Sequence, residues 1–245
     1  RPTPPYSSAA SDVYKRQKES MPYIHDVIKL IRAELPKDIP LIGFGGAPFT
    51  LASYAIEGKG SRNYVFVKQM MYGDAGAWHG LMEKITDTVI DYMNYPIDSG
   101  VQAVQLFDSW VGTLSPSDYR EYVMPHSQRM MKEITGRVPV IHFGTGNPAL
   151  APLMAEAGGD VLALDWRTPL LETWNATGVK SVQGNMDPII LCADKASVKR
   201  KAKEVLDEVD GRPGHIFNLG HGIIPETPVE NVKALVDFVH EYSAR

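Results

Sequence analysis

The chain has 245 residues, 44% hydrophobic and 22% charged, which is a globular composition and enough for one large domain or two small ones. The net charge of −4, with no basic cluster denser than 199–203, argues against a dedicated nucleic-acid-binding protein. The single cysteine, Cys192, excludes an internal disulfide and a cysteine-rich zinc site. No apolar run approaches the roughly 18 residues of a membrane span. We therefore expect a cytoplasmic protein that binds neither nucleic acid nor membrane.

The first residues differ from the rest of the chain. Residues 1–17 (RPTPPYSSAASDVYKRQ) are small, polar and rich in proline. They show no apolar period, and they lack the apolar core of a secretory signal. We predict that residues 1–20 are a leader, either disordered or foreign to the natural protein, and that residues 21–245 form the folded domain.

From Met21 onward, short apolar or β-branched runs alternate with amphipathic stretches. The predicted strands are 41–45, 101–108, 138–144, 161–166, 181–185 and 215–220. They lack clean alternation of apolar and polar residues, as expected when both faces of a parallel sheet are buried. Because a helix-length stretch separates each strand from the next, the pattern predicts βα units on a parallel sheet.

The helix starts follow one rule. Five predicted helices begin with a capping residue and then a proline: Ser115-Pro116, Asn147-Pro148, Thr168-Pro169, Asp187-Pro188 and Thr227-Pro228. The capping oxygen accepts from free backbone N–H groups, and proline at the first helical position sacrifices no hydrogen bond. Glu230, three residues after Thr227, completes a predicted capping box. Internal prolines predict a kink at Pro96 and a break at Pro125.

Two architectures contain such units, a closed (βα)8 barrel and an open doubly wound sheet. No G-x-G-x-x-G motif follows a predicted strand and no P-loop is present, which removes the commonest reason for an open sheet. About six units are visible, whereas a TIM-type barrel has eight. The sequence therefore predicts an α/β fold, an incomplete (βα)8 barrel without its first two units, with its chemistry at the C-terminal strand ends.

The segments at these strand ends are distinctive. In chain order they are GFGGAPFTLASYAIEG (43–58), LFDSWVG (106–112), HFGTG (142–146), QGNMDP (183–188) and FNLGHGI (217–223). In this order and spacing, from about Ile39 to Ser243, the sequence resembles the uroporphyrinogen decarboxylase family. The resemblance implies a cofactor-free carboxy-lyase, usually a homodimer. Its substrate is uroporphyrinogen, whose four acetate side chains lose their carboxyl groups to give coproporphyrinogen in haem and porphyrin biosynthesis.

The same resemblance assigns four residues to the substrate cleft. Tyr54 matches a tyrosine whose phenol donates to a substrate carboxylate, and Ser109 matches a hydroxyl position with the same capacity. His221 matches a cleft histidine, and its flanking glycines let the backbone approach a ligand. Phe44 matches an aromatic residue that borders the macrocycle, although such a strand residue equally suits a core. We predict Tyr54 and His221 as catalytic, all four as substrate-binding, and no metal site.

Other candidates near the strand ends are assigned to the fold. We expect capping, supporting or packing roles for Asp108, Asp165, Asp187, Trp110, Trp166 and Trp174. We expect His142 to hydrogen-bond within the barrel mouth. Arg167 follows a strand end directly but matches no assigned family position.

The sequence departs from the family before residue 41. Nothing in residues 1–40 resembles the family's arginine-rich motif, which clamps carboxylates, or its aspartate, which binds the pyrrole N–H groups. We therefore expect this chain to be inactive alone and, because two strand edges would be exposed, to aggregate. One alternative is accordingly an inactive barrel fragment with at most weak porphyrinogen binding, which an activity assay distinguishes.

A second alternative is a zinc-dependent methyltransferase of the same barrel superfamily. Those enzymes carry a His-x-Cys motif on the corresponding strand and a second cysteine further on, because soft thiolates hold the zinc ion. Here the strand places Gly144 at the cysteine position, and Cys192 is alone. A metal analysis distinguishes this alternative.

The leader prediction has a direct test. Deleting residues 1–20 should leave the thermal midpoint of unfolding unchanged, because a segment without packed side chains contributes no burial. Differential scanning calorimetry of the two chains measures this. A fall of several degrees would show that the segment belongs to the domain.

Overall fold

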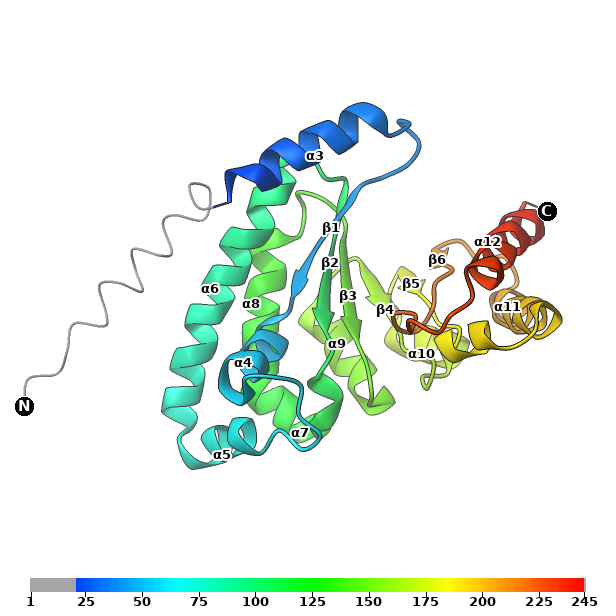
Figure 1. The fold of residues 1–245 in the computed structure, drawn as a ribbon. Helices are drawn as coiled ribbons and strands as arrows, with labels where there is room; N and C mark the ends of the chain where they lie inside the picture. The colour runs from blue at the N-terminus through cyan, green and yellow to red at the C-terminus, as the bar shows by residue number, and fades with distance from the viewer. Residues whose placement is uncertain (1–20, 245) are drawn as a thin grey trace, which may run out of the picture.

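The computed structural model describes residues 21–244, so the predicted leader lies outside the described residues and stays a prediction. Six strands form one parallel sheet in chain order (Figure 1). They are β1 (Ile42–Gly46), β2 (Ala103–Asp108), β3 (Val140–Gly144), β4 (Val161–Ala163), β5 (Ser181–Gln183) and β6 (His215–Ile216). Within residues 21–244, β1 pairs only with β2 and β6 only with β5. This topology confirms the predicted partial barrel, although the last three strands are shorter than predicted.

Helices connect the strands as the alternation predicts. They are α3 (Pro22–Glu34), α4 (Pro48–Glu57), α5 (Val65–Gly73), α6 (Ala75–Ser99), α7 (Pro116–Asp118), α8 (Met124–Ile134), α9 (Ala151–Ala157), α10 (Leu170–Thr177), α11 (Lys195–Val209) and α12 (Val229–Ser243). The break near Pro125 is present, since a π-helical turn at Tyr119–Val123 separates α7 from α8. Pro96 lies inside α6, and the helix continues through it to Ser99.

The two faces of the sheet meet different surroundings. Val104 and Leu106 of β2 are buried in a core with side chains of α6 and α8, which lie side by side (Figure 1). The alternate residue Phe107 points to the opposite face, where it packs with Phe143 of β3. Because strand side chains alternate, every second residue of β2 and β3 faces the cleft and the others face the helices.

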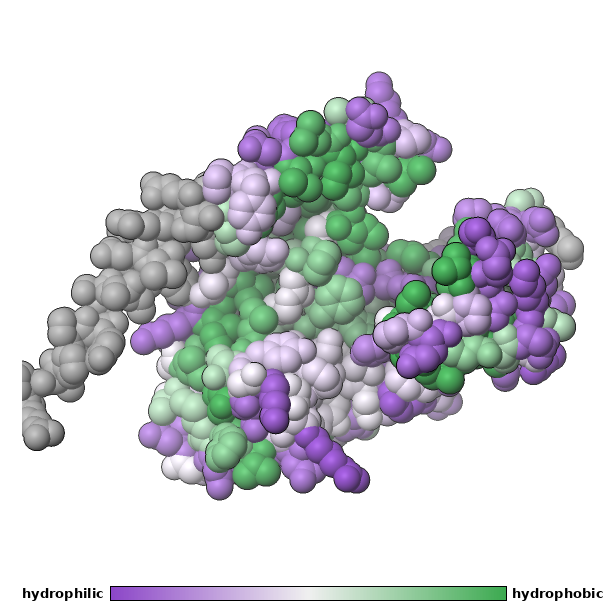
Figure 2. All heavy atoms as spheres, viewed as in Figure 1, coloured by the Kyte–Doolittle hydropathy of each residue, from purple (hydrophilic) through white to green (hydrophobic). Residues whose placement is uncertain are grey.

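α3 packs on α6 but leaves much apolar surface uncovered. Its Ile28 is buried, and His25 Nδ1 lies 3.0 Å from the Ser99 hydroxyl oxygen. The exposed apolar residues of this helix are Tyr23, Val27, Leu30 and Ile31. Figure 2 shows these apolar side chains gathered over α3. α3 thus packs on α6 through one side and leaves apolar side chains on its outer face.

The predicted helix caps are correct at three of the five positions. Ser115, Asn147 and Asp187 accept backbone N–H groups of the turns that follow them. The caps at Thr168 and Thr227 are wrong, because α10 and α12 begin after the proline and show no side-chain cap.

The hydroxyl groups of Thr168 and Thr227 form no hydrogen bond to the helix starts that they were predicted to cap. The Thr168 hydroxyl donates to Asp165 instead of capping α10. The Thr227 hydroxyl is buried without a partner among the described residues, and Glu230 pairs with Lys233. The predicted capping box is therefore not formed.

This difference predicts opposite responses to two conservative substitutions. Ser115→Ala removes a real cap and should lower the free energy of unfolding by about 1 kcal/mol. Thr227→Val replaces an unpartnered buried hydroxyl by a methyl group and should be neutral or stabilising. Urea denaturation of both variants measures the difference. A loss at Thr227→Val equal to that at Ser115→Ala would contradict the observed helix start.

Candidate functional site

Two cavities open at the C-terminal strand ends. One, of about 420 Å³, is lined by apolar and amide side chains, with Phe107 and Phe143 from β2 and β3 and Gln183 from β5. The other, of about 410 Å³, is lined by strand-end loops and by the loop between α4 and α5. Ser109, directly after β2, and His221, in the loop after β6, line both cavities. Two of the four predicted site residues, which lie 112 positions apart, are therefore brought to the junction of one divided cleft.

The other two predicted site residues lie one aromatic ring away from these cavities. The Phe44 ring packs edge-on against Phe107 at 6.1 Å between centroids, and it is 66% exposed. The Tyr54 ring packs edge-on against Trp110 at 5.9 Å, and it is 45% exposed. Neither lines either cavity, although each contacts a residue that does. Their roles toward a substrate remain predictions.

Two glycines let the cleft loops pack on one another. A Cβ on Gly112 would lie 2.1 Å from the carbonyl oxygen of Thr145, so the loop after β2 can touch the loop after β3 only with glycine there. A Cβ on Gly220 would lie 2.3 Å from the backbone nitrogen of Trp166. Since His221 is the next residue, this close approach sets its imidazole against Trp166 and Phe143, at 6.2 Å from each ring.

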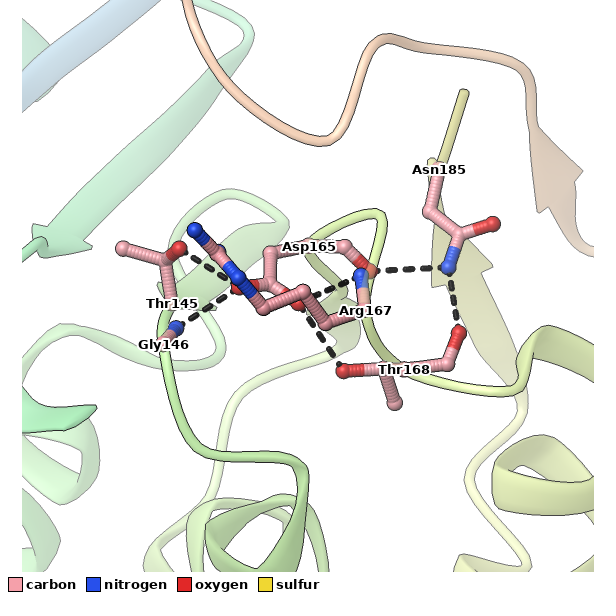
Figure 3. A network of polar contacts seen from close by, with 6 residues as sticks. All are labelled: Thr145, Gly146, Asp165, Arg167, Thr168 and Asn185. Carbon is pink, nitrogen blue, oxygen red and sulfur yellow. Dashed lines mark hydrogen bonds and ion pairs between the residues drawn. The ribbon is translucent and has the colours of Figure 1, made fainter. Parts of the chain in front are cut away.

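A buried carboxylate fixes these loops (Figure 3). Asp165, 1% exposed, accepts from the Thr145 hydroxyl and the Gly146 N–H after β3, at 2.7 and 2.6 Å. It also accepts from the backbone N–H of Arg167 at 3.0 Å, from its guanidinium at 2.8 Å, and from the Thr168 hydroxyl at 3.2 Å. Burial alone would raise the pKa of Asp165, but these hydrogen bonds outweigh it and hold the pKa below its ordinary value. Asp165 therefore has the supporting role expected from the sequence, because its carboxylate holds the loops after β3 and β4 together.

The amide of Asn185 extends this network to β5. Its Nδ2 donates to the carbonyl oxygens of Asp165 and Thr168, at 2.8 and 2.6 Å. The loops after β3, β4 and β5 are therefore connected through polar contacts from one carboxylate and one amide (Figure 3).

Two arginines of the cleft had no role predicted from the sequence. Arg62, in the loop after α4, and Arg167, after β4, line the same 410 Å³ cavity. Arg167 directly follows a predicted strand, and because barrel chemistry lies at the C-terminal strand ends, this position was the signal that could have assigned it to the cleft. Arg62 lies in a polar loop without any pattern, so its place depends on how the loop folds back over the strand ends.

Behind the sheet, Asp108 is a second buried carboxylate. Its Oδ1 accepts from the Thr50 hydroxyl at 2.9 Å, whereas its Oδ2 has no partner among the described residues. Burial raises the pKa of Asp108 to about 7, even though the hydrogen bond from Thr50 favours the ionised form. Thr50 belongs to the helix of Tyr54, and its hydroxyl oxygen also accepts from the backbone N–H of Trp110 at 3.4 Å. Asp108 therefore supports the contact between α4 and the loop of Ser109.

The expectation for His142 is wrong. It lies on β3 opposite Leu106, so it shares the helix-facing side of the sheet and not the barrel mouth. Its Nδ1 lies 3.3 Å from the Gly158 carbonyl oxygen at the end of α9. Burial lowers the pKa of His142 to about 4. The alternation of strand side chains, which a short apolar run does not reveal, decided this orientation.

Comparison with known proteins identifies the family. The family model described as "Uroporphyrinogen decarboxylase (URO-D)" matches residues 2–242 of this chain. The chain belongs to the uroporphyrinogen decarboxylase family. The match begins within the segment predicted as leader, whose structure lies outside residues 21–244.

Similar proteins agree with this assignment. The chain is 53% identical over 226 residues to a uroporphyrinogen decarboxylase of Sorangium cellulosum, and 52% identical over 230 residues to one of Carboxydothermus hydrogenoformans. These matches cover 91% and 93% of this chain but 64% and 65% of the relatives, so the chain spans just under two thirds of their length. A solved methyltransferase from Methanosarcina mazei has the same fold, with a TM-score of 0.78 at 23% identity, covering 91% of this chain and 64% of that one.

Residues 21–244 lack two further kinds of feature. No helix there is long and apolar enough to cross a membrane. Groups of three or more His, Cys, Asp or Glu side chains suited to a metal ion are likewise not found in that range. The free Cys192 is exposed, away from the two cavities.

Asp108 predicts a pH dependence of stability. A carboxyl whose pKa is about 7 in the fold and ordinary when unfolded binds more protons in the folded state, so its contribution to stability falls as pH rises from about 4 to 7. Asp108→Asn should abolish that fall, and its stability relative to the parent should rise by on the order of 2 kcal/mol between pH 5 and 8.

Urea denaturation at the two pH values measures this effect. Glu133→Gln, which removes an exposed carboxylate from α8, is the matched control and should show no such rise. Equal pH profiles for Asp108→Asn and the parent would mean that the buried carboxyl is ionised at little cost.

Proposed function

We propose that this chain forms part of the cleft that decarboxylates the four acetate side chains of uroporphyrinogen to give coproporphyrinogen. Family membership together with the convergence of Ser109 and His221 on one divided cleft supports the proposal. Such C-terminal strand ends are where barrel enzymes place their chemistry. The first cavity, with Phe107, Phe143 and Ile223 in its lining, offers an apolar surface to a tetrapyrrole ring.

The proposed chemistry needs little from the protein beyond binding and protons. Protonation of the pyrrole carbon next to the one that bears the acetate turns the ring into an electron sink. The bond to the carboxyl carbon then breaks, its electron pair enters the ring, and carbon dioxide leaves. A proton taken up at the remaining methylene carbon gives a methyl group, and loss of the proton first added to the ring restores the aromatic pyrrole. No cofactor is needed because the substrate ring holds the electrons.

Roles for the predicted site residues follow from their groups and positions. The His221 imidazole, at the junction of the two cavities, would hold a carboxylate or a proton beside the ring. The Ser109 hydroxyl would donate to a carboxylate there, and the Tyr54 phenol would donate from the side of Trp110. We further propose a cytoplasmic homodimer, as the family resemblance implies.

A turnover experiment tests the proposal. Residues 1–245 alone should convert uroporphyrinogen no faster than the uncatalysed reaction, because the described sheet has unpaired edges at β1 and β6 and does not close into a barrel. Joined to the part of the Sorangium cellulosum relative that it does not match, the chain should produce coproporphyrinogen under anaerobic conditions. A folded chimera without turnover would contradict the proposed function.

The same chimera tests the two predicted catalytic residues. Tyr54→Phe should lower kcat/KM by the equivalent of about 1.5–3 kcal/mol, the scale of a hydrogen bond to a charged group, and His221→Asn by more. Tyr72→Phe is the matched control, because its phenol donates to Asp118 on the exposed surface and not in the cleft. Turnover near the parent value in both cleft variants would remove these residues from the site.

A further inference from the structure

We propose that Arg62 and Arg167 form a carboxylate-binding subsite at the rim of the cleft, separate from the surface that takes the tetrapyrrole ring. This inference rests on the proposed function for the identity of the ligand, a carboxylate-bearing side chain of the substrate. It begins from the contrast between the two cavities. The 420 Å³ cavity has no guanidinium or ammonium group in its lining, whereas the 410 Å³ cavity has two guanidinium groups.

Arg167 is held in place before any ligand arrives. Its guanidinium lies 3.7 Å from the centre of the Trp166 ring, and one Nη donates to Asp165 at 2.8 Å. The side chain of Arg167 is nevertheless 47% exposed, and Asp165 takes one of its guanidinium donors, which leaves others for a ligand. A fixed, planar fork of donors matches a carboxylate and loses little conformational entropy when it binds one.

Arg62 brings a positive charge without a counterion. It is exposed, and within residues 21–244 it forms no ion pair or hydrogen bond. The neighbouring Ser61 hydroxyl accepts the Tyr64 N–H at 3.0 Å, which anchors the loop that carries Arg62. The charge of Arg167 is balanced by Asp165, so Arg62 leaves the cavity with an excess of one positive charge.

The rest of the lining offers donors and no competing acid. No carboxylate side chain belongs to the described lining of this cavity. The Trp110 indole N–H, in the same lining, is buried without a hydrogen-bond partner in the described part of the chain. Buried N–H groups are almost always partnered, so an unpartnered one beside two guanidinium groups points to a missing acceptor. A carboxylate supplies both the negative charge and the acceptor atoms.

The arrangement gives the subsite a function in orientation. Because Ser109 and His221 line both cavities, a ring in the apolar cavity can extend a carboxylate arm past them to the arginines. An arm that is anchored at Arg62 and Arg167 fixes the rotation of the ring, and with it the acetate that lies near His221. The two arginines are thus assigned as substrate-positioning residues.

Uroporphyrin binding to residues 1–245, followed by porphyrin fluorescence at submicromolar concentration, tests the subsite. Arg62→Gln and Arg167→Gln should each weaken binding roughly 5- to 30-fold, the range of a lost charge-assisted hydrogen bond, and less so at high salt. Arg200→Gln is the matched control, because it removes one positive charge from α11 at a distance from the cleft and should not change the affinity. Thermal midpoints confirm that each variant folds.

Arg167→Lys provides a second variant that keeps the charge and its pairing with Asp165. It loses the planar fork and the stacking on Trp166, so its affinity should lie between those of the parent and Arg167→Gln. Parent-like binding by both glutamine variants would overturn the subsite and leave the proposed function standing.

A parent chain that fails to bind uroporphyrin would instead count against the proposed function. Calorimetric titration with butane-1,2,3,4-tetracarboxylate then decides the subsite by itself. Binding that is lost in Arg62→Gln and Arg167→Gln but kept in Arg200→Gln would support it. Absence of binding to the parent chain, or binding that is equal in all variants, would overturn it.

Discussion

The buried carboxylate of Asp165 is the interaction on which the cleft depends. A charge in such a place is costly unless donors surround it, and here two hydroxyls, two backbone N–H groups and a guanidinium do so. The donors come from the loops after β3 and β4. Asn185, after β5, donates to the backbone carbonyl oxygen of Asp165 and so connects a third loop to the same residue. The strands β4 and β5, three residues each, thus carry loops of fixed geometry, because polar contacts at their ends supply what the short ladders do not.

From this fixed centre the cleft divides into an apolar half and a cationic half. Trp166 and Arg167, adjacent to Asp165, form the wall of the cationic half, and Gly220 lets the loop of His221 lie directly on that wall. The apolar half is lined by the cleft-facing residues of the strands, including Phe107 and Phe143. Such a division suits a ligand with an apolar ring and charged arms, as the proposed porphyrinogen substrate has.

Two further titratable groups lie on the helix side of the sheet. Asp108 and His142 are both fully buried, and burial shifts the pKa of each toward its neutral form, to about 7 and about 4. They lie on neighbouring strands, and each is followed in the sequence by a residue that lines the cleft: Asp108 by Ser109, and His142 by Phe143. The sheet therefore separates these buried titratable groups, which lie against the helices, from the groups that line the cleft.

The alternation of short apolar runs with amphipathic stretches was sufficient to predict six parallel βα units, the partial barrel and the strand ends where the cleft lies. It succeeded because periodicity, proline positions and turn residues act within a few neighbours along the chain. It did not determine the outward orientation of His142 or the fate of the Thr227 hydroxyl, nor that Arg62 joins Arg167 in one cavity. These depend on contacts between residues tens of positions apart. A strand residue shows its facing only once its neighbours are paired, and a loop arginine acquires a role only when the fold brings a second cation and an unpartnered N–H beside it.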